Sequence, residues 1–138
     1  MSPRLLLSLL PVMVSAMPPI VSLPQREAWD ANNTWNHQGD QYAVSTAAGT
    51  GSMRPYIRGG EILLLEKYTG QPLEVGMWVV RPRWDKPNGV FHAVIEVSKW
   101  GYVRTQGTNC MFPDDWYKAD RTRYIVRKVI RIEGGAST

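Results

Sequence analysis

The sequence predicts an all-β, mostly antiparallel domain, and three observations lead to this fold class. Twelve glycines and ten prolines are spread along the 138 residues, and both residue types favour turns over long helices. The apolar runs are short and are bounded by glycine or proline, which is typical of strands. No window keeps a helical period of apolar residues, although a single turn can follow Gly51.

The expected strands follow one another from Tyr42 onward. The first strong apolar run, at 61–68, lies between the turn-forming pairs Gly59-Gly60 and Thr69-Gly70. Its length favours a buried strand over a helix. The second run begins after Gly76 and is stopped by Pro82, which has no backbone donor. A turn at 87–89 leads into the third run, and a turn at 100–101 makes the fourth run its hairpin partner. We expect these strands at 61–68, 77–81, 90–97, 102–105 and 124–132.

Length and composition limit the domain organisation and the classes of partner. With 138 residues, 43% of them hydrophobic and 20% charged, the chain has room for one globular domain. The net charge of +4 is mild and no run of lysine or arginine occurs, so nucleic acid is not an expected partner. A solvated basic face explains this charge most simply, and loose contact with an anionic membrane surface is the other explanation.

The only cysteine, Cys110, excludes an intramolecular disulfide and a cysteine-rich zinc site. It lies in a polar stretch that contains a proline, and we interpret it as incidental. We expect neither a metal nor an organic cofactor.

The first 24 residues resemble a secretory signal peptide. One positive charge at Arg4 precedes the apolar residues 5–14, and small or tolerated residues precede a cleavage point after Ala16. A membrane anchor ending near Pro24 is the alternative, weakened by the four prolines of this span, and a buried structural segment is a third reading. We expect a signal or anchor at 1–24, a linker at 25–42, an extracytoplasmic domain at 43–133 and a disordered tail at 134–138.

The segment 49–55 has the composition of a nucleophile loop. Two glycines allow a substrate to approach the backbone closely, and Ser52 follows them. A serine hydroxyl needs a base to remove its proton. His37 lies in the expected linker, whereas His92 lies within an apolar strand. His92 is therefore the candidate base, and a buried structural histidine is the competing explanation.

These residues resemble the type I signal peptidases. The stretch 51–55, Gly-Ser-Met-Arg-Pro, is similar to the family's Ser-Met-x-Pro box around the nucleophile. Later segments match in the same order over residues 43–131, with Glu61, Met77 and Thr108 at positions where the family carries Asp. The matching segments are 60–64, 76–80, 91–94, 106–109 with the acidic pair after it, and 124–129.

The resemblance implies a compact β domain of the signal-peptidase and repressor-peptidase kind. It also implies a serine endopeptidase that cleaves exported proteins after small residues. With histidine at the position of the general base, the chain resembles the archaeal and endoplasmic-reticulum-like branch of the signal peptidases. The implied roles are nucleophile for Ser52, general base for His92, orientation of the base by Asp115 in preference to Asp114, oxyanion contacts from Thr50 and the Ser52 backbone, and substrate contacts from Met53 and Gly51.

Several alternatives stay open at this point. A Ser/Lys dyad would need Lys67, Lys86 or Lys99, none of which occupies the base position. A self-cleaving, repressor-type peptidase would also use lysine. A degenerate relative that binds without cleaving is favoured by the changes at Met77 and Thr108. An exported precursor and a membrane surface are the expected partners, with the six tryptophans divided between the core and a membrane-facing rim. The oligomeric state is left open.

Overall fold

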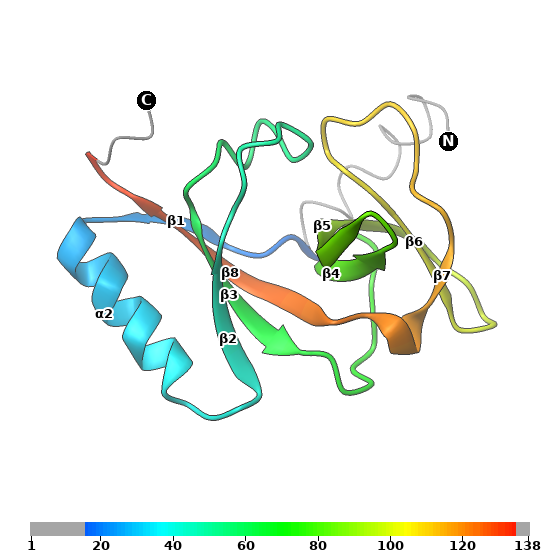
Figure 1. The fold of residues 1–138 in the computed structure, drawn as a ribbon, viewed down its shortest axis with the longest axis horizontal. Coiled ribbons are helices and arrows are strands. Elements are labelled where there is room, and N and C mark those ends of the chain that lie inside the picture. The colour runs from blue at the N-terminus through cyan, green and yellow to red at the C-terminus, as the bar shows by residue number, and fades with distance from the viewer. Residues whose placement is uncertain (1–15, 135–138) are drawn as a thin grey trace.

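The last strand, β8 (Tyr124–Ile132), organises the sheet in the computed structural model, which describes residues 16–134. The sheet has eight strands in the order β2-β3-β8-β4-β5-β6-β7, and β1 also pairs with β8 (Figure 1). Every pairing is antiparallel except the one between β1 and β8. The other elements are β1 (Ile20–Leu23), α2 (Gln25–Asn36), β2 (Tyr42–Thr46), β3 (Ile62–Lys67), β4 (Trp78–Arg83), β5 (Lys86–Val97), β6 (Tyr102–Gln106), β7 (Tyr117–Lys118) and the 3-10 helix η1 (Ala119–Arg121). The predicted all-β, mostly antiparallel class is confirmed.

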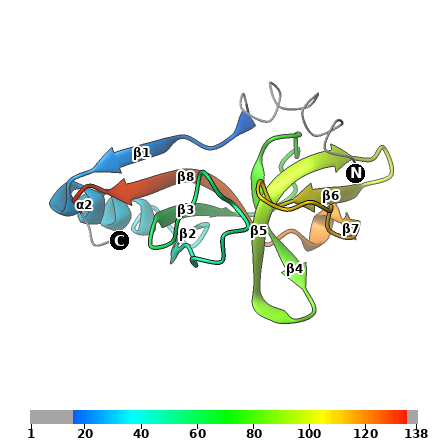
Figure 2. The ribbon, with the colours of Figure 1, turned by 90° about the horizontal axis from the view of Figure 1, so that it is seen from above.

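The long strand β8 links two ends of the molecule. At one end, α2 packs against β1, β2, β3 and β8; at the other, β5, β6 and β7 continue the sheet (Figure 1). The β4–β5 hairpin projects from the rest of the sheet (Figure 2). The segments that follow β2 and β6 form the site described below.

The first part of strand β3 is buried on both faces, which explains why its sequence is a continuous apolar run. The first four residues of β3, Ile62 to Leu65, are all buried. Because side chains alternate along a strand, Leu63 and Leu65 join one core cluster while Ile62 and Leu64 join another. The first cluster also holds Trp78, Ala93, Ile95, Val126 and Val129. The second lies beneath α2, around Ala28 and Ile130.

The five expected strands are present, with two differences at the β4–β5 hairpin. Strand β4 continues through Pro82 to Arg83, and β5 already begins at Lys86. The pairing register shifts between Arg81 and Arg83, so Pro82 lies at an irregularity, where a proline is tolerated in a sheet. The sequence also did not reveal β7, which is only two residues long.

The expected linker at 25–42 is wrong, because most of it is helix α2. Its apolar residues Ala28, Ala31 and Trp35 are spaced at i, i+3 and i+7, which places them on one face. Ala28 is fully buried on the sheet, and Trp35 donates its Nε1 hydrogen to the carbonyl of Leu65 at 2.9 Å. The apolar stripe is narrow and the remaining residues are polar except for the exposed Trp29, so the composition of the segment hid its period.

The expected boundary at Pro24 is also wrong. Ile20 to Leu23 form β1, whose partners are Val129 to Ile132, so these four residues belong to the sheet and not to a membrane anchor. Cleavage after Ala16 would leave β1 intact. Residues 1–15, with most of the predicted leader, lie outside the described residues, as does the predicted tail except Gly134, which is in a turn. No helix among residues 16–134 has the length and apolar character to cross a membrane.

Candidate active site

Ser52 lies in the long connection between β2 and β3, here called the serine loop (residues 47–61). Its base is closed by backbone hydrogen bonds in both directions between Ala47 and the pair Gly60–Glu61. Gly59 needs to be glycine, because its φ is +115° and a Cβ there would lie 2.8 Å from Cα of Gly49. The buried carboxylate of Glu61 accepts hydrogen bonds from two backbone amides of the loop. Gly59 and Glu61 therefore fix the backbone conformation of the serine loop.

The expected turn after Gly51 is present. Ile57 donates to the carbonyl of Met53 at 3.0 Å, and Arg54 donates to the carbonyl of Gly51 at 3.3 Å. The side chain of Met53 is 2% exposed and belongs to the central core. Met53 therefore anchors the turn from below, and the expected substrate contact of its side chain is wrong because that side chain is buried. Gly51 lies beside the serine with a φ of +87°.

A second segment, residues 107–110 after β6, holds the serine loop from the other side. The amide of Asn109 donates to the carbonyl of Ser52 at 2.9 Å, and its side chain donates to the carbonyl of Gly51 at 3.0 Å. The hydroxyl of Thr108 donates to the carbonyl of Arg54 at 2.8 Å. Thr108, at a position where the signal-peptidase pattern has an acidic residue, thus helps to position the serine loop.

His92 is carried by β5, opposite Val79 of β4, and is 4% exposed. Its Nδ1 lies 2.6 Å from Oδ2 of Asp114, and the same oxygen accepts a hydrogen bond from the hydroxyl of Thr105 at 2.7 Å. The guanidinium of Arg81, 4.0 Å from Asp114, donates to Thr105 at 3.2 Å. His92 thus belongs to a charged, hydrogen-bonded network.

The environment of Asp114 keeps its carboxyl ionised. Burial alone would raise the pKa of Asp114, but the hydrogen bond and charge of His92, the Thr105 hydroxyl and the Arg81 charge together lower it. An ionised carboxylate only accepts hydrogen bonds. The proton shared by His92 and Asp114 is therefore on Nδ1 of His92. In the neutral imidazole, the lone pair of Nε2 is then free to accept a second proton.

The second ring nitrogen of His92 faces the serine loop. Nε2 is buried and has no hydrogen-bond partner among residues 16–134. A Cβ built on Gly107 would lie 3.1 Å from this Nε2 and 2.6 Å from the carbonyl oxygen of Ser52, so the two residues meet at Gly107. The Ser52 hydroxyl itself lies 3.2 Å from the hydroxyl of Thr50. In the described part of the chain it makes no hydrogen bond to Nε2.

Most predicted site residues come together here. Thr50 lies next to Ser52, with its Oγ1 3.4 Å from the Ser52 amide nitrogen. The preference for Asp115 over Asp114 is wrong, because Asp115 is exposed and contacts this network only through its carbonyl, which accepts from Arg81 at 2.8 Å. The adjacent residue Asp114 makes the contact because its amide is hydrogen-bonded to the carbonyl of Thr105 at 2.8 Å, and this fixes its backbone against β6.

The remaining basic candidates lie elsewhere. Lys67, Lys86 and Lys99 are all exposed, and the Lys99 ammonium lies over the ring of Trp100 at 5.0 Å. His37 is exposed at the end of α2, where Nδ1 lies 2.6 Å from the carbonyl of Asn33.

Sequence reasoning missed the place of Cys110. Its Sγ lies 3.9 Å from the carbonyl oxygen of Ser52, and a Cβ on Gly107 would meet this sulfur at 2.6 Å. Burial, followed by the charge of Asp114, raises the pKa of the Cys110 thiol. The only sequence signal was its position four residues before Asp114. The sequence predicts that Thr105 and Arg81 lie in strands, but it does not predict that they contact Asp114, because these contacts depend on which strands pair.

Residues 16–134 contain no cluster of three side chains suited to hold a metal ion. The comparisons with known proteins give no relative for the chain. No protein-family model matches it. No curated protein is significantly similar, and no solved structure is significantly similar either.

Proposed function

We propose that this protein is a serine endopeptidase of the signal-peptidase type, with Ser52 as nucleophile and His92 as general base. The observation that carries the proposal is the arrangement around His92. Nδ1 is held by the Asp114 carboxylate at 2.6 Å, while the buried Nε2 has no partner in the described chain and faces the serine loop across Gly107. A buried polar atom without a partner costs free energy, which favours a functional role over a structural one.

The residues suffice for acyl transfer by a Ser-His-Asp triad. Nε2 of His92 takes the proton of the Ser52 hydroxyl as Oγ attacks the carbonyl carbon of the scissile peptide bond. The imidazolium, stabilised by Asp114, gives this proton to the departing amine when the C–N bond breaks. A water molecule then attacks the acyl-enzyme ester, with His92 taking its proton. The bond between the acyl group and Oγ breaks, and His92 returns the proton to restore the Ser52 hydroxyl. For the first step, Oγ has to turn from Thr50 toward His92, a change expected because catalytic hydrogen bonds often form only with substrate bound.

The negative charge that develops on the substrate oxygen has two candidate donors. The Thr50 hydroxyl and the Ser52 amide are neighbours, and the amide donates to the hydroxyl oxygen at 3.4 Å, a contact that it has to exchange for the substrate oxygen. Donors aimed at a developing oxyanion each contribute about 3 kcal/mol.

An extended substrate has a free strand edge available. Strand β2 is at the end of the sheet order and, within the described part of the chain, pairs only with β3, and it leads directly into the serine loop. Ser45 and Thr46 at its end are exposed. Pairing of a peptide along this edge would bring its backbone toward Ser52.

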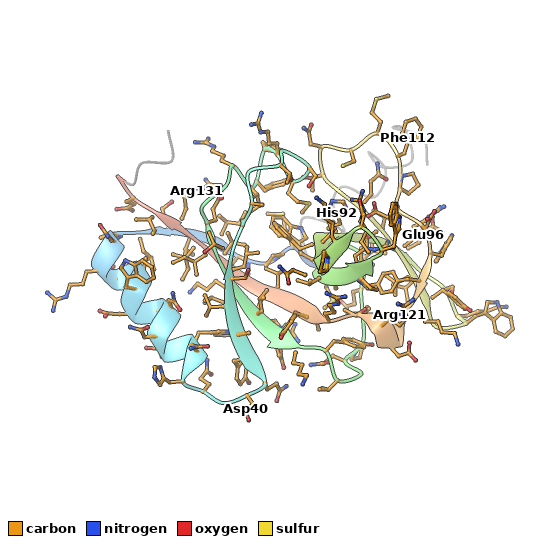
Figure 3. All side chains as sticks on the ribbon, viewed as in Figure 1. Asp40, His92, Glu96, Phe112, Arg121 and Arg131 are labelled. Atoms are coloured by element: carbon orange, nitrogen blue, oxygen red, sulfur yellow. The ribbon has the colours of Figure 1, made fainter. Side chains whose placement is uncertain are left out.

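The surface next to the site suits contact with a membrane. Met111 and Phe112 are 73% and 75% exposed and lie in the β6–β7 connection, with Phe112 labelled there in Figure 3. Such exposed apolar side chains favour a lipid interface. They follow Asn109, which contacts the serine loop. An extracytoplasmic location at a membrane surface, with exported precursors as substrates, is the working hypothesis.

Cleavage of a generic secretory precursor by the purified protein tests the proposal. Wild-type protein should cut after a small residue, as read by mass spectrometry of the product ends. Ser52→Ala and His92→Ala should each lose the activity by about 10³-fold or more, with unchanged circular dichroism. Ser22→Ala is a control at an exposed serine of β1, outside the serine loop and the β2 edge, and should keep the activity.

A serine-directed acylating probe separates an enzyme from an inactive scaffold. Labelling at Ser52 that requires His92 supports catalysis. A folded wild-type protein that is neither labelled nor active would contradict the proposal and favour the non-catalytic binding module.

A further inference from the structure

A cavity lies beside the Asp114 network but apart from the serine loop. Its volume is about 540 Å³, and its walls come from the tip of the β4–β5 hairpin, the segment 113–117 and the region of η1. Asp114 lines it, whereas neither Ser52 nor His92 does. Figure 3 labels Arg121 at η1 and His92 on β5. The proposed peptidase reaction does not use this cavity.

Positive charge predominates in the walls. Four arginines face two aspartates there: Arg81, Arg83, Arg121 and Arg123 against Asp114 and Asp115.

Only two of these arginines have a carboxylate neighbour. Arg83 pairs with Asp85 at 2.7 Å, and Arg81 lies 4.0 Å from Asp114. Arg121 and Arg123 have no carboxylate within 4.0 Å among residues 16–134, although Nη1 of Arg123 donates to the carbonyl of Pro87. The cavity therefore presents two guanidinium groups whose charge no acidic side chain neutralises.

Two tryptophans add flat apolar walls. Trp84, at the hairpin tip, is 96% exposed, and Trp116 is 40% exposed. The Arg104 guanidinium lies 5.0 Å from the centre of the Trp116 ring, and this cation–π contact holds the indole. An indole left in water has apolar surface that a bound ring can cover.

We propose that this cavity binds a small anionic molecule, namely a phosphate or carboxylate group attached to a ring-sized apolar body. Guanidinium groups bind both anions through paired N–H donors. The indoles of Trp84 and Trp116 provide contact area for the ring. Arg121 and Arg123 hold the anion, since the other two arginines already have a carboxylate neighbour. This site does not depend on the peptidase assignment.

Titration of the full-length protein with phenyl phosphate, benzoate and benzyl alcohol, followed by calorimetry, tests the site. Saturable binding of phenyl phosphate or benzoate, at least about tenfold tighter than benzyl alcohol, supports it, and the tighter of the two anions identifies the preferred group. Inorganic phosphate should bind more weakly than phenyl phosphate, because it cannot contact the indoles. No saturable binding of either anion, or equal binding of the neutral alcohol, overturns the proposal.

Matched charge variants locate the binding. Arg121→Gln should weaken phenyl phosphate binding by about tenfold, and the exposed position of Arg121 leaves the fold unaffected. Arg121→Gln combined with Arg123→Gln should abolish it. The control pairs Arg26→Gln with Arg58→Gln, two exposed arginines outside the cavity, and removes the same charge. If the control weakens binding as much as the cavity variants do, the attraction is general and the proposed site is wrong.

Discussion

Asp114 is held by Thr105 through both its backbone and its side chain. The Asp114 amide donates to the Thr105 carbonyl at 2.8 Å, and the Thr105 hydroxyl donates to Oδ2 at 2.7 Å. Thr105 lies on β6, next to the strand that carries His92, and pairs with Val94 there. The carboxylate and the imidazole are therefore set at a fixed separation by neighbouring strands, before any substrate binds. Such preorganisation is what charge stabilisation in a reaction requires.

The two adjacent aspartates should have different effects on cleavage. Asp114→Asn removes the acceptor that keeps the proton on Nδ1 of His92, and the proposed reaction should slow by about 10²- to 10⁴-fold. Asp115→Asn should stay near the wild-type rate, because the Asp115 side chain is exposed. Precursor cleavage kinetics measure both. Equal rates for the two variants would contradict the triad.

The stability of the protein should depend on the ionisation of Asp114 in acid. The folded-state pKa of Asp114 lies below the ordinary value of 3.8. Its ionised form therefore stabilises the fold at pH values above 3.8, and this contribution is lost as the pH falls through the lower, folded-state pKa. Urea unfolding at pH values from about 2.5 to 6 should show a wild-type advantage over Asp114→Asn that shrinks with acid. An advantage independent of pH would refute this linkage.

Gly107 should tolerate no side chain. A Cβ there would lie 2.6 Å from the Ser52 carbonyl oxygen and 3.1 Å from Nε2 of His92, so Gly107→Ala should push the serine loop away from the base. We expect loss of cleavage with a destabilisation of about 1–3 kcal/mol.

Gly101→Ala is the control for the Gly107 variant. Its φ of +85° also disfavours a side chain, but nothing lies within 4 Å of the added Cβ and Gly101 is in the β5–β6 turn. This variant should lose stability and keep the activity. Activity at the wild-type level in a folded Gly107→Ala would argue against the proposed contact.

Alkylation of Cys110 should block the site. An adduct on its Sγ, which is 3.9 Å from the Ser52 carbonyl, would occupy the space beside His92. Because the pKa of Cys110 is raised above 9.0, the thiolate is scarce at neutral pH. Labelling by N-ethylmaleimide should therefore be slow at pH 7 and faster as the pH rises.

Cys110→Ser provides the comparison for this experiment. The variant should keep the cleavage activity after the same treatment, since it has no thiol to modify. Full activity of wild-type protein that mass spectrometry shows to be alkylated would place the thiol away from the substrate path.

The sequence predicts the strands better than their surroundings. The run at 61–68 is easy to recognise because both faces of its first half are covered, and the run at 124–132 because its buried positions are apolar and β-branched. Helix α2 was missed because only Ala28, Ala31 and Trp35 mark its buried face. Strand β1 was missed because the same apolar residues suit a leader.

The residues of the candidate site were also predicted only in part. The pattern of glycines around Ser52 and the polar His92 in an apolar strand are visible in the sequence, and the structure brings both to Gly107. The choice between Asp114 and Asp115 is not visible. Neighbouring residues of an extended segment point in opposite directions, and the direction is set by Thr105, whose role depends on the pairing of β5 with β6.

The parallel pairing of β1 with β8 also has a consequence for biosynthesis. Ile20 is among the first described residues to leave the ribosome, whereas its partner Val129 is among the last. Contacts between such distant parts of a chain form slowly, because a long loop has to close first. We therefore expect the sheet to be completed only after β8 has left the ribosome, and until then the edge of β3 that pairs with β8 is open to the cell's chaperones.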